Sequence, residues 1–459
     1  MLRPRRPRIP SAPAPFDPPQ PRRLRVGHLD VLHLERRDLP LVHVDLVLAS
    51  GSGHDAPDSP GVAFATAALL DEGAGRRSAL EISGELQDLG TSLSTAVDLE
   101  STSLSLDVLR SNLDGALAIL ADVVLRPHLA QSELERIQAE MAARSLERRA
   151  SPSQVAQLAL WAAVYGRHPF ARPALPLPGG RAVRRRDVVR FHRERYRSSG
   201  AFLVVAGDVG RDELEALVGP LFGSWRPDIV AGWAPARPPP RGPRLVLVER
   251  EGADESVLRV GQILPGRSSV GRGSARAEVQ LLNTILGGSF TSRLNRNLRE
   301  RHGYTYGAHS SFVLLRRHGL FVVGAQVESR VTARALGQIL IELEAIGRRP
   351  VSRAELDKAR SLALEEIPEG METLRGLADA FVDLEFYGEP LGALRRQPLA
   401  LARVTPDGLL RTARRLVRPD EATLVCVGDV ARLRAELERS FGPAEDRDLD
   451  GVALRRGPC

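Results

Sequence analysis

The chain has 459 residues, 43% of them hydrophobic, which suits two domains of about 200 residues each better than one core. Its net charge of +7 does not indicate a nucleic-acid partner, because Asp and Glu are mixed among the arginines and no basic stretch carries interleaved aromatic residues. With only Cys426 and Cys459, the sequence gives no support to a disulfide framework or a cysteine-based metal site.

The amino-terminal residues carry no recognisable export or membrane segment. No apolar stretch reaches the roughly 18 residues that a spanning helix needs, and the basic start lacks the apolar core of a signal peptide. We therefore expect a cytoplasmic protein without a membrane span, and a misassigned start codon would leave a periplasmic location open. Residues 1–23, rich in proline and arginine, are predicted to form a flexible arm.

A first domain is predicted over residues 24–225. Its apolar residues alternate with polar ones, as in half-buried strands, at Leu41–Ser50 and Thr102–Leu109. Apolar residues at helical spacing predict three helices, at Ala116–Leu125, Glu133–Arg149 and Ser153–Val164. Residues 226–243 contain three consecutive prolines and are predicted to be a stiff linker.

A second domain is predicted over residues 244–445, followed by a tail over residues 446–459. Strands are expected at Leu245–Glu249 and Leu320–Val327. Helices are expected at Ala275–Leu286 and Ala333–Ile346.

The two predicted domains end alike. Phe202–Trp225 and Thr423–Pro443 each contain an apolar strand, a Gly-Asp-Val turn and a helix with apolar residues at helical spacing. This repeat indicates a duplicated domain. Runs of strands separated by runs of helices favour an α+β fold, in which each mainly antiparallel sheet is covered by helices on one face.

One stretch is highly specific, LNTILGGSFTSRLNRNLRERHGYTYGAHSSF at Leu282–Phe312. It closely resembles the signature in the carboxy-terminal half of the insulinase, pitrilysin and mitochondrial processing peptidase family of zinc peptidases. The resemblance continues in order through YGRHPFARP (Tyr165–Pro173), RYRSSGAFLVVAGDV (Arg195–Val209) and LADAFVDLEFYGEP (Leu377–Pro390). It extends from about Leu24 to Pro443 and implies the family's two duplicated α+β halves.

The family's zinc motif is missing from the place where the resemblance puts it. The motif, H-x-x-E-H, sets two histidines and a glutamate on one helical face, where they hold zinc and activate its water. Aligning this sequence with the family's pattern puts Phe64, Ala67 and Ala68 at these three positions. The third zinc ligand of the family, a glutamate further along the chain, falls within Ala142–Ser145. We expect no zinc in this chain.

Two residues match the family's motif in the second half. The resemblance implies that Arg299 and Tyr306 reach across a closed chamber to the zinc site of a facing first half, where they help to hold the scissile carbonyl. Taken alone, Arg299 is better explained as a solvated helix residue and Tyr306 as a packed strand residue, and it is the resemblance that favours the functional interpretation. Tyr306 is expected early in the strand that follows a helix ended by Gly303.

One further segment matches a place where family members contact peptide, and a second is a weaker candidate for contact with substrate. Ser92, Leu93, Ser94 and Thr95 belong to a predicted edge strand, which binds peptide by adding it as an extra strand or is simply solvated. Gly287 and Gly288 form a turn that lets two backbones approach, or a loop that faces substrate.

The function predicted on this basis is that of a zinc-free, non-catalytic subunit. It would pair with a homologous chain that bears H-x-x-E-H and zinc, and together they would enclose peptide substrates. The alternative is a purely structural member of the family without a role in proteolysis. A hydrolase with another catalytic set is disfavoured, because the sequence has no G-x-S-x-G elbow and no reactive-cysteine context.

Overall fold

The computed structural model describes residues 17–172, 175, 182–228, 242 and 244–454. Its first half is built on a six-stranded sheet. The strand order is β1 (Arg22–Val26), β2 (Leu29–Glu35), β6 (Ala201–Gly207), β3 (Leu41–Leu48), β5 (Thr102–Leu109) and β4 (Ser94–Val97). Strands β2 and β6 run parallel, and the other neighbours are antiparallel.

The second half repeats this sheet. Its order is β12 (Ala444–Arg447), β7 (Leu245–Glu249), β11 (Thr423–Gly428), β8 (Glu255–Pro265), β10 (His318–Glu328) and β9 (Ala308–Val313). Five strands in each sheet follow the same order and directions, which confirms the predicted duplicated α+β fold. The outer strand differs, because β1 pairs antiparallel with β2 whereas β12 pairs parallel with β7.

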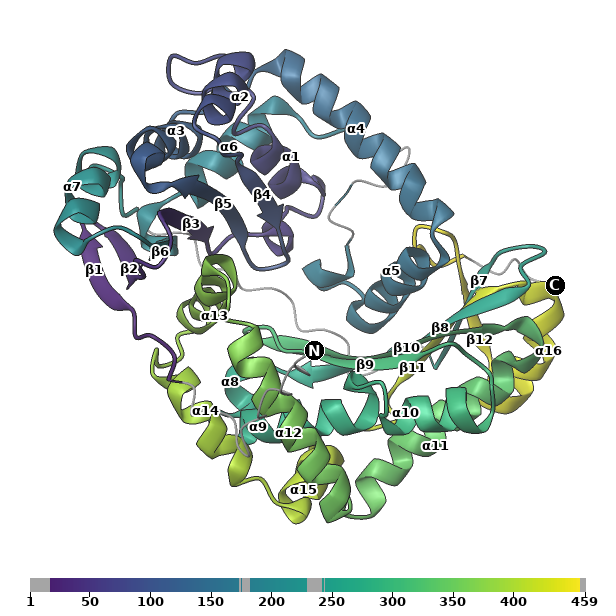
Figure 1. The fold of residues 1–459 in the computed structure, drawn as a ribbon. Helices are drawn as coiled ribbons and strands as arrows, with labels where there is room; N and C mark the ends of the chain where they lie inside the picture. Colours follow the sequence, from purple (N-terminus) through teal and green to yellow (C-terminus); the bar gives the residue numbers. More distant parts are fainter. Residues whose placement is uncertain (1–16, 173–174, 176–181, 229–241, 243, 455–459) are drawn as a thin grey trace, which may run out of the picture.

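Helices fill the connections in both halves (Figure 1). The first half contains α1 (Val62–Ala68), α2 (Ala79–Asp88), α3 (Leu113–Leu125), α4 (Gln131–Ala150), α5 (Pro152–Tyr165), α6 (Arg185–Arg195) and α7 (Arg211–Phe222). The second contains α8 (Arg267–Val270), α9 (Ser274–Asn283), α10 (Arg293–Asn295), α11 (Thr332–Arg348), α12 (Arg353–Glu369), α13 (Leu374–Phe386), α14 (Ala393–Ala402), α15 (Pro406–Leu416) and α16 (Val430–Phe441). Residues at the helix ends determine where several helices begin. For example, Ser151 caps α5, and Pro152 occupies its first position.

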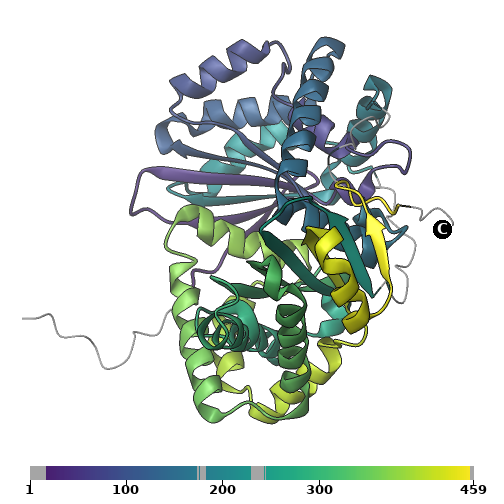
Figure 2. The ribbon, with the colours of Figure 1, turned by 90° about the vertical axis from the view of Figure 1, so that its right-hand side faces the viewer.

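The halves exchange one helix each. Helix α5 of the first half packs on β8 and β11 of the second sheet, and α13 of the second half packs on β3 and β6 of the first (Figure 1). Figure 2 shows from the side how the first half, in purple and blue, lies on the second, in green and yellow. The sequence predicted helices on one face of each sheet, but both faces are covered around β6 and β11. Every residue of these two strands is therefore buried.

Some predicted segments lie partly outside the described residues. This holds for positions 1–16 of the expected arm, 229–241 and 243 of the expected linker, and 455–459 of the expected tail. Strand β1 begins at Arg22, within the expected arm, and β12 extends to Arg447, within the expected tail. Among the described residues, no helix is both long and apolar enough to cross a membrane.

Candidate functional site

Helix α1 carries the positions that correspond to the zinc motif. Its start is held by a carboxylate from the preceding loop, because Asp55 accepts hydrogen bonds from Gly61 N at 2.6 Å and Ala63 N at 2.8 Å. Gly61 has a φ of +89°, a conformation that favours glycine. Burial, opposed by these amide hydrogen bonds, raises the pKa of Asp55 to about 7. This cap has no local sequence signal, because Asp55 precedes Gly61 by six residues, outside the usual spacing of a helix cap.

The residues on α1 do not fit a zinc ion. Phe64 and Ala68 are partly buried and Ala67 is buried, and none of the three has a nitrogen, oxygen or sulfur donor in its side chain. From α4, the guanidinium carbon of Arg144 lies 5.5 Å from the centre of the Phe64 ring. A positive charge therefore stands where a third zinc ligand would come from. Over the described ranges, no three His, Cys, Asp or Glu side chains are grouped to hold a metal.

Strand β4 lies at the edge of the first sheet, next to α1. It pairs only with β5, and its other side has no strand neighbour among the described residues. Ser94 and Thr95 are exposed on it, and Ser92 is exposed just before it. Leu93 is partly buried and packs against the core of the first half. Main-chain groups for an added strand are thus present here.

The motif of the second half folds into two π-helical segments that flank α10. They are η5 (Thr284–Gly288) and η6 (Arg296–Arg301). A Cβ on Gly287 would lie 2.5 Å from Ser310 N, so this buried glycine allows η5 to approach β9 closely. Gly288 is exposed, and a Cβ there would lie 2.7 Å from Asn283 Nδ2. Gly287 thus has a packing role, whereas Gly288 is accessible.

Arg299 lies in η6, and its guanidinium carbon is 4.1 Å from the centre of the Phe290 ring. Phe290 is itself 67% exposed, so this cation–π pair lies at the surface. Arg296, one turn earlier, is different because its guanidinium pairs with Glu355 at 3.0 Å.

Tyr306 lies in the loop between η6 and β9, and not in a strand as the sequence predicted. The strand begins only at Ala308, because Thr305 forms a tight turn in which its Oγ1 accepts from Gly307 N at 3.1 Å. Tyr306 is 96% exposed. Within the described chain, no hydrogen bond, ion pair or ring contact joins it to Arg299. Figure 1 places α1 and α10 in opposite halves of the molecule.

Comparisons with known proteins agree with this arrangement. Residues 32–176 match the family model Insulinase (Peptidase family M16), and residues 182–362 match Peptidase M16 inactive domain. An uncharacterized zinc protease of Mycobacterium leprae is 30% identical over 336 residues, covering 68% of this chain and 73% of that protein. A protein of Helicobacter pylori named non-peptidase homolog YmxG is 22% identical over 373 residues, covering 79% and 83%.

Solved structures show the same fold. The crystal structure of a peptidase M16 inactive domain from Pseudomonas fluorescens has a TM-score of 0.81 at 24% identity, covering 89% of this chain and 98% of that one. The crystal structure of a protease from Helicobacter pylori has a TM-score of 0.82 at 18% identity, covering 90% and 100%.

Proposed function

Because this chain belongs to peptidase family M16, the insulinase family, we propose that it is a non-catalytic subunit of a heteromeric peptidase. Its partner is a homologous chain that bears H-x-x-E-H and the zinc ion. The two chains enclose a peptide, and this chain contributes half of the chamber wall, including the edge strand β4. Such an interface would be large, because each half of the chamber must meet a facing half.

The absence of metal chemistry in this chain is supported by α1 and α4. Phe64, Ala67 and Ala68 offer hydrocarbon where imidazole and carboxylate donors are needed. The guanidinium of Arg144 would in addition repel a divalent cation at this place. Hydrolysis therefore has to be carried out by groups of the partner.

The exposure of Tyr306 is the observation that carries the proposal. An aromatic side chain that is 96% exposed contributes almost nothing to the packing of its own chain. Arg299 is held over Phe290 at the surface and forms no ion pair within the described residues. In the complex, these two side chains would donate hydrogen bonds to the scissile carbonyl oxygen as it gains negative charge.

Two substitutions made only in this chain test the role. Arg299→Ala and Tyr306→Phe should each lower turnover by the complex about 100-fold, or ~2.7 kcal/mol of transition-state stabilisation, without dissociating it. The loss should appear mainly in kcat, because the interaction strengthens as the carbonyl becomes tetrahedral. Since both act on one oxygen, the double variant should lose less than the product of the single losses.

Arg301→Ala is the matched control, because Arg301 is exposed in the same π-helical segment and has no proposed role at the scissile carbonyl. If Arg299→Ala and Arg301→Ala behave alike, Arg299 is a solvated residue and the role is wrong. A chain that stays monomeric with every H-x-x-E-H homologue, in co-expression followed by size-exclusion chromatography, would favour the purely structural alternative.

The expectation that this chain binds no zinc can be tested separately. Elemental analysis of the purified chain after dialysis should find no stoichiometric zinc, and one tightly held ion per chain would contradict the proposal. The triple variant Phe64→His, Ala67→Glu, Ala68→His should still bind zinc poorly, because Arg144 remains over the site. Adding Arg144→Glu should raise its zinc affinity, since this change removes the cation and supplies a carboxylate.

A further inference from the structure

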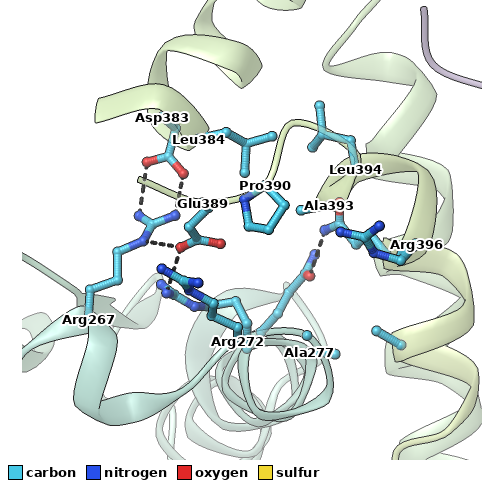
Figure 3. A pocket seen from close by; sticks show the side chains of 15 residues that line it. Arg267, Arg272, Ala277, Asp383, Leu384, Glu389, Pro390, Ala393, Leu394 and Arg396 are labelled. Atoms are coloured by element: carbon cyan, nitrogen blue, oxygen red, sulfur yellow. Dashed lines mark hydrogen bonds and ion pairs between the residues drawn. The ribbon is translucent and has the colours of Figure 1, made fainter. Parts of the chain in front are cut away.

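A cavity of about 450 Å³ lies in the second half, between α9 on one side and α13 and α14 on the other (Figure 3). One part of its lining is apolar. Hydrocarbon is supplied there by Ala277 of α9, Leu384 of α13, Leu394 of α14 and Pro390, which precedes α14. The cavity is large enough for a small molecule and has no part in the proposed role of Arg299 and Tyr306.

The rest of the lining is charged, with two carboxylates that are already paired. Asp383 accepts from Arg267 Nη1 at 2.9 Å, and Glu389 accepts from Arg267 Nε at 2.7 Å. Glu389 also accepts from Arg276 Nη2 at 2.9 Å. Figure 3 shows these bonds as one connected network at one end of the cavity. Both acidic groups are therefore neutralised by Arg267 and Arg276.

Two more arginines line the cavity and leave positive charge in excess. Arg272 donates to the carbonyl oxygen of Gly388 at 3.0 Å, and Arg396 lies across the cavity on α14. Within the described residues, neither of them pairs with a carboxylate. Among the described residues, the buried Nε of Arg276 also has no hydrogen-bond partner. Four guanidinium groups thus face two carboxylates.

The first turn of α9 adds to this positive field. Residues 272, 273, 276 and 277 line the cavity, so the helix begins at its wall. The N-cap is Gly273, whose lack of a side chain leaves the first amides without a side-chain cap. Burial, together with the nearby charge of Arg267, lowers the pKa of Arg276, as expected where positive charges are crowded.

We propose that this cavity binds a small amphiphilic anion, a carboxylate or phosphate monoester that carries an apolar body. The head group contacts Arg272, Arg276 and the first turn of α9, where charge-assisted hydrogen bonds are strong. The apolar body lies against Leu384, Pro390 and Leu394. Arg396 attracts the anion from the opposite wall.

Calorimetric titration of the full chain with four probes tests the site. Octyl phosphate and octanoate should both bind, and their relative affinities tell which head group the site prefers. Octanol, which lacks the charge, and inorganic phosphate, which lacks the apolar body, should each bind at least about 10-fold more weakly. Equal binding of octanol and the octyl anions, or no binding of either octyl anion, would overturn the proposal.

Matched arginine variants locate the site. Arg272→Gln should weaken octyl phosphate binding about 10-fold and Arg396→Gln by a smaller factor. Arg395→Gln is the control, because Arg395 is adjacent to Arg396 on α14 but pairs with Asp17 at 2.5 Å outside the cavity lining. Leu394→Ala should weaken octyl phosphate and leave inorganic phosphate unchanged. Circular dichroism melting confirms that each variant is folded, and equal effects of Arg272→Gln and Arg395→Gln would refute the site.

Discussion

The two exchanged helices form contacts of different chemistry. Helix α5 and the residues after it form one apolar cluster with valines and a leucine of the second sheet, and aromatic rings pack within this cluster. Trp161 stacks on Tyr165 with ring centres 5.1 Å apart, and Phe170 meets Tyr165 edge-on at 5.5 Å. A Cβ on Gly261 of β8 would lie 2.7 Å from Leu160, so helix and sheet approach closely. Tyr165 is fully buried, and its hydroxyl donates to Gly319 O at 2.9 Å.

Helix α13 meets the first sheet through a mixture of apolar and ionisable groups. Phe381 is fully buried there, but Arg375 of the same helix pairs with Asp107 of β5 at 3.0 Å. Asp107 also accepts a hydrogen bond from His43 of β3, at 2.7 Å. Asp45 of β3 is buried in the same region, and its Oδ1 has no hydrogen-bond partner in the described structure.

The two halves thus share one architecture but stabilise it in two ways. The α5 contact rests mainly on apolar contact area, and the titratable group beside Tyr165 is His168, whose pKa is lowered to about 4 by burial. The α13 contact depends on the protonation of Asp45 and Asp107, whose pKa values shift in opposite directions. We therefore expect the halves to respond differently to substitution and to pH.

The largest effect is expected for Tyr165→Ala at the α5 contact. Loss of a fully buried aromatic side chain should lower the free energy of unfolding by about 3–5 kcal/mol at pH 8, where the neighbouring His168 is uncharged. Urea denaturation measures it. Tyr165→Phe separates the hydroxyl from the ring and should cost only about 1 kcal/mol. If Tyr165→Ala costs no more than Tyr165→Phe, the ring cluster is not what holds α5.

A smaller effect with the opposite sign is expected for Asp45→Asn. Burial raises the pKa of Asp45 to about 6, with Asp379 adding to the rise and His43 opposing it. The proton therefore stabilises the folded state, and this stability is lost as pH rises from about 4 through 6. At pH 8 the variant should be more stable than the native chain by about 1–2 kcal/mol. At pH 4 the two should melt alike, and destabilisation at pH 8 would contradict the assignment.

The smallest effect is expected for Asp107→Asn. The hydrogen bond from His43, followed by that from Arg375, lowers the pKa of Asp107 to about 2, against partial burial. Its charge stabilises the fold above about pH 4, and this stability is lost as pH falls toward 2. Because the carboxylate is 53% exposed, solvent screening limits the loss at pH 7 to about 1 kcal/mol. Combining it with Arg375→Gln should give less than an additive loss in thermal melts.

The sequence predicts the strands and helices whose bounds follow from the pattern of apolar residues along the chain. Strands β5 and β7 have the predicted bounds, because their alternating or continuous apolar residues match what each face buries. The exchange of α5 and α13 was not predicted. The helical periodicity of Ser153–Val164 shows that one face is buried, but it does not tell which sheet buries it.

The candidate site likewise combines features that the sequence predicts with features that depend on how the helices pack. The missing donors at Phe64, Ala67 and Ala68 are visible in the sequence, whereas the position of Arg144 over Phe64 depends on how α4 crosses α1. The resemblance and the helix end at Gly303 predict Tyr306 early in a strand, whereas the turn at Thr305 delays the start of β9 to Ala308. The two π-helical segments have no simple sequence signal, although the paired glycines at 287 and 288 mark a close approach.

The exchange of helices also has a consequence for synthesis on the ribosome. When the first half has emerged, the face of β6 formed by Phe202, Val204 and Ala206 still lacks α13, and α5 still lacks the sheet that it covers. The first half has a core of its own, but this face of β6 stays uncovered until α13 is made, and α5 lacks its full contact until β11 is made. We therefore expect the contact between the two halves to form late, with aggregation or chaperone capture as the competing outcomes until then.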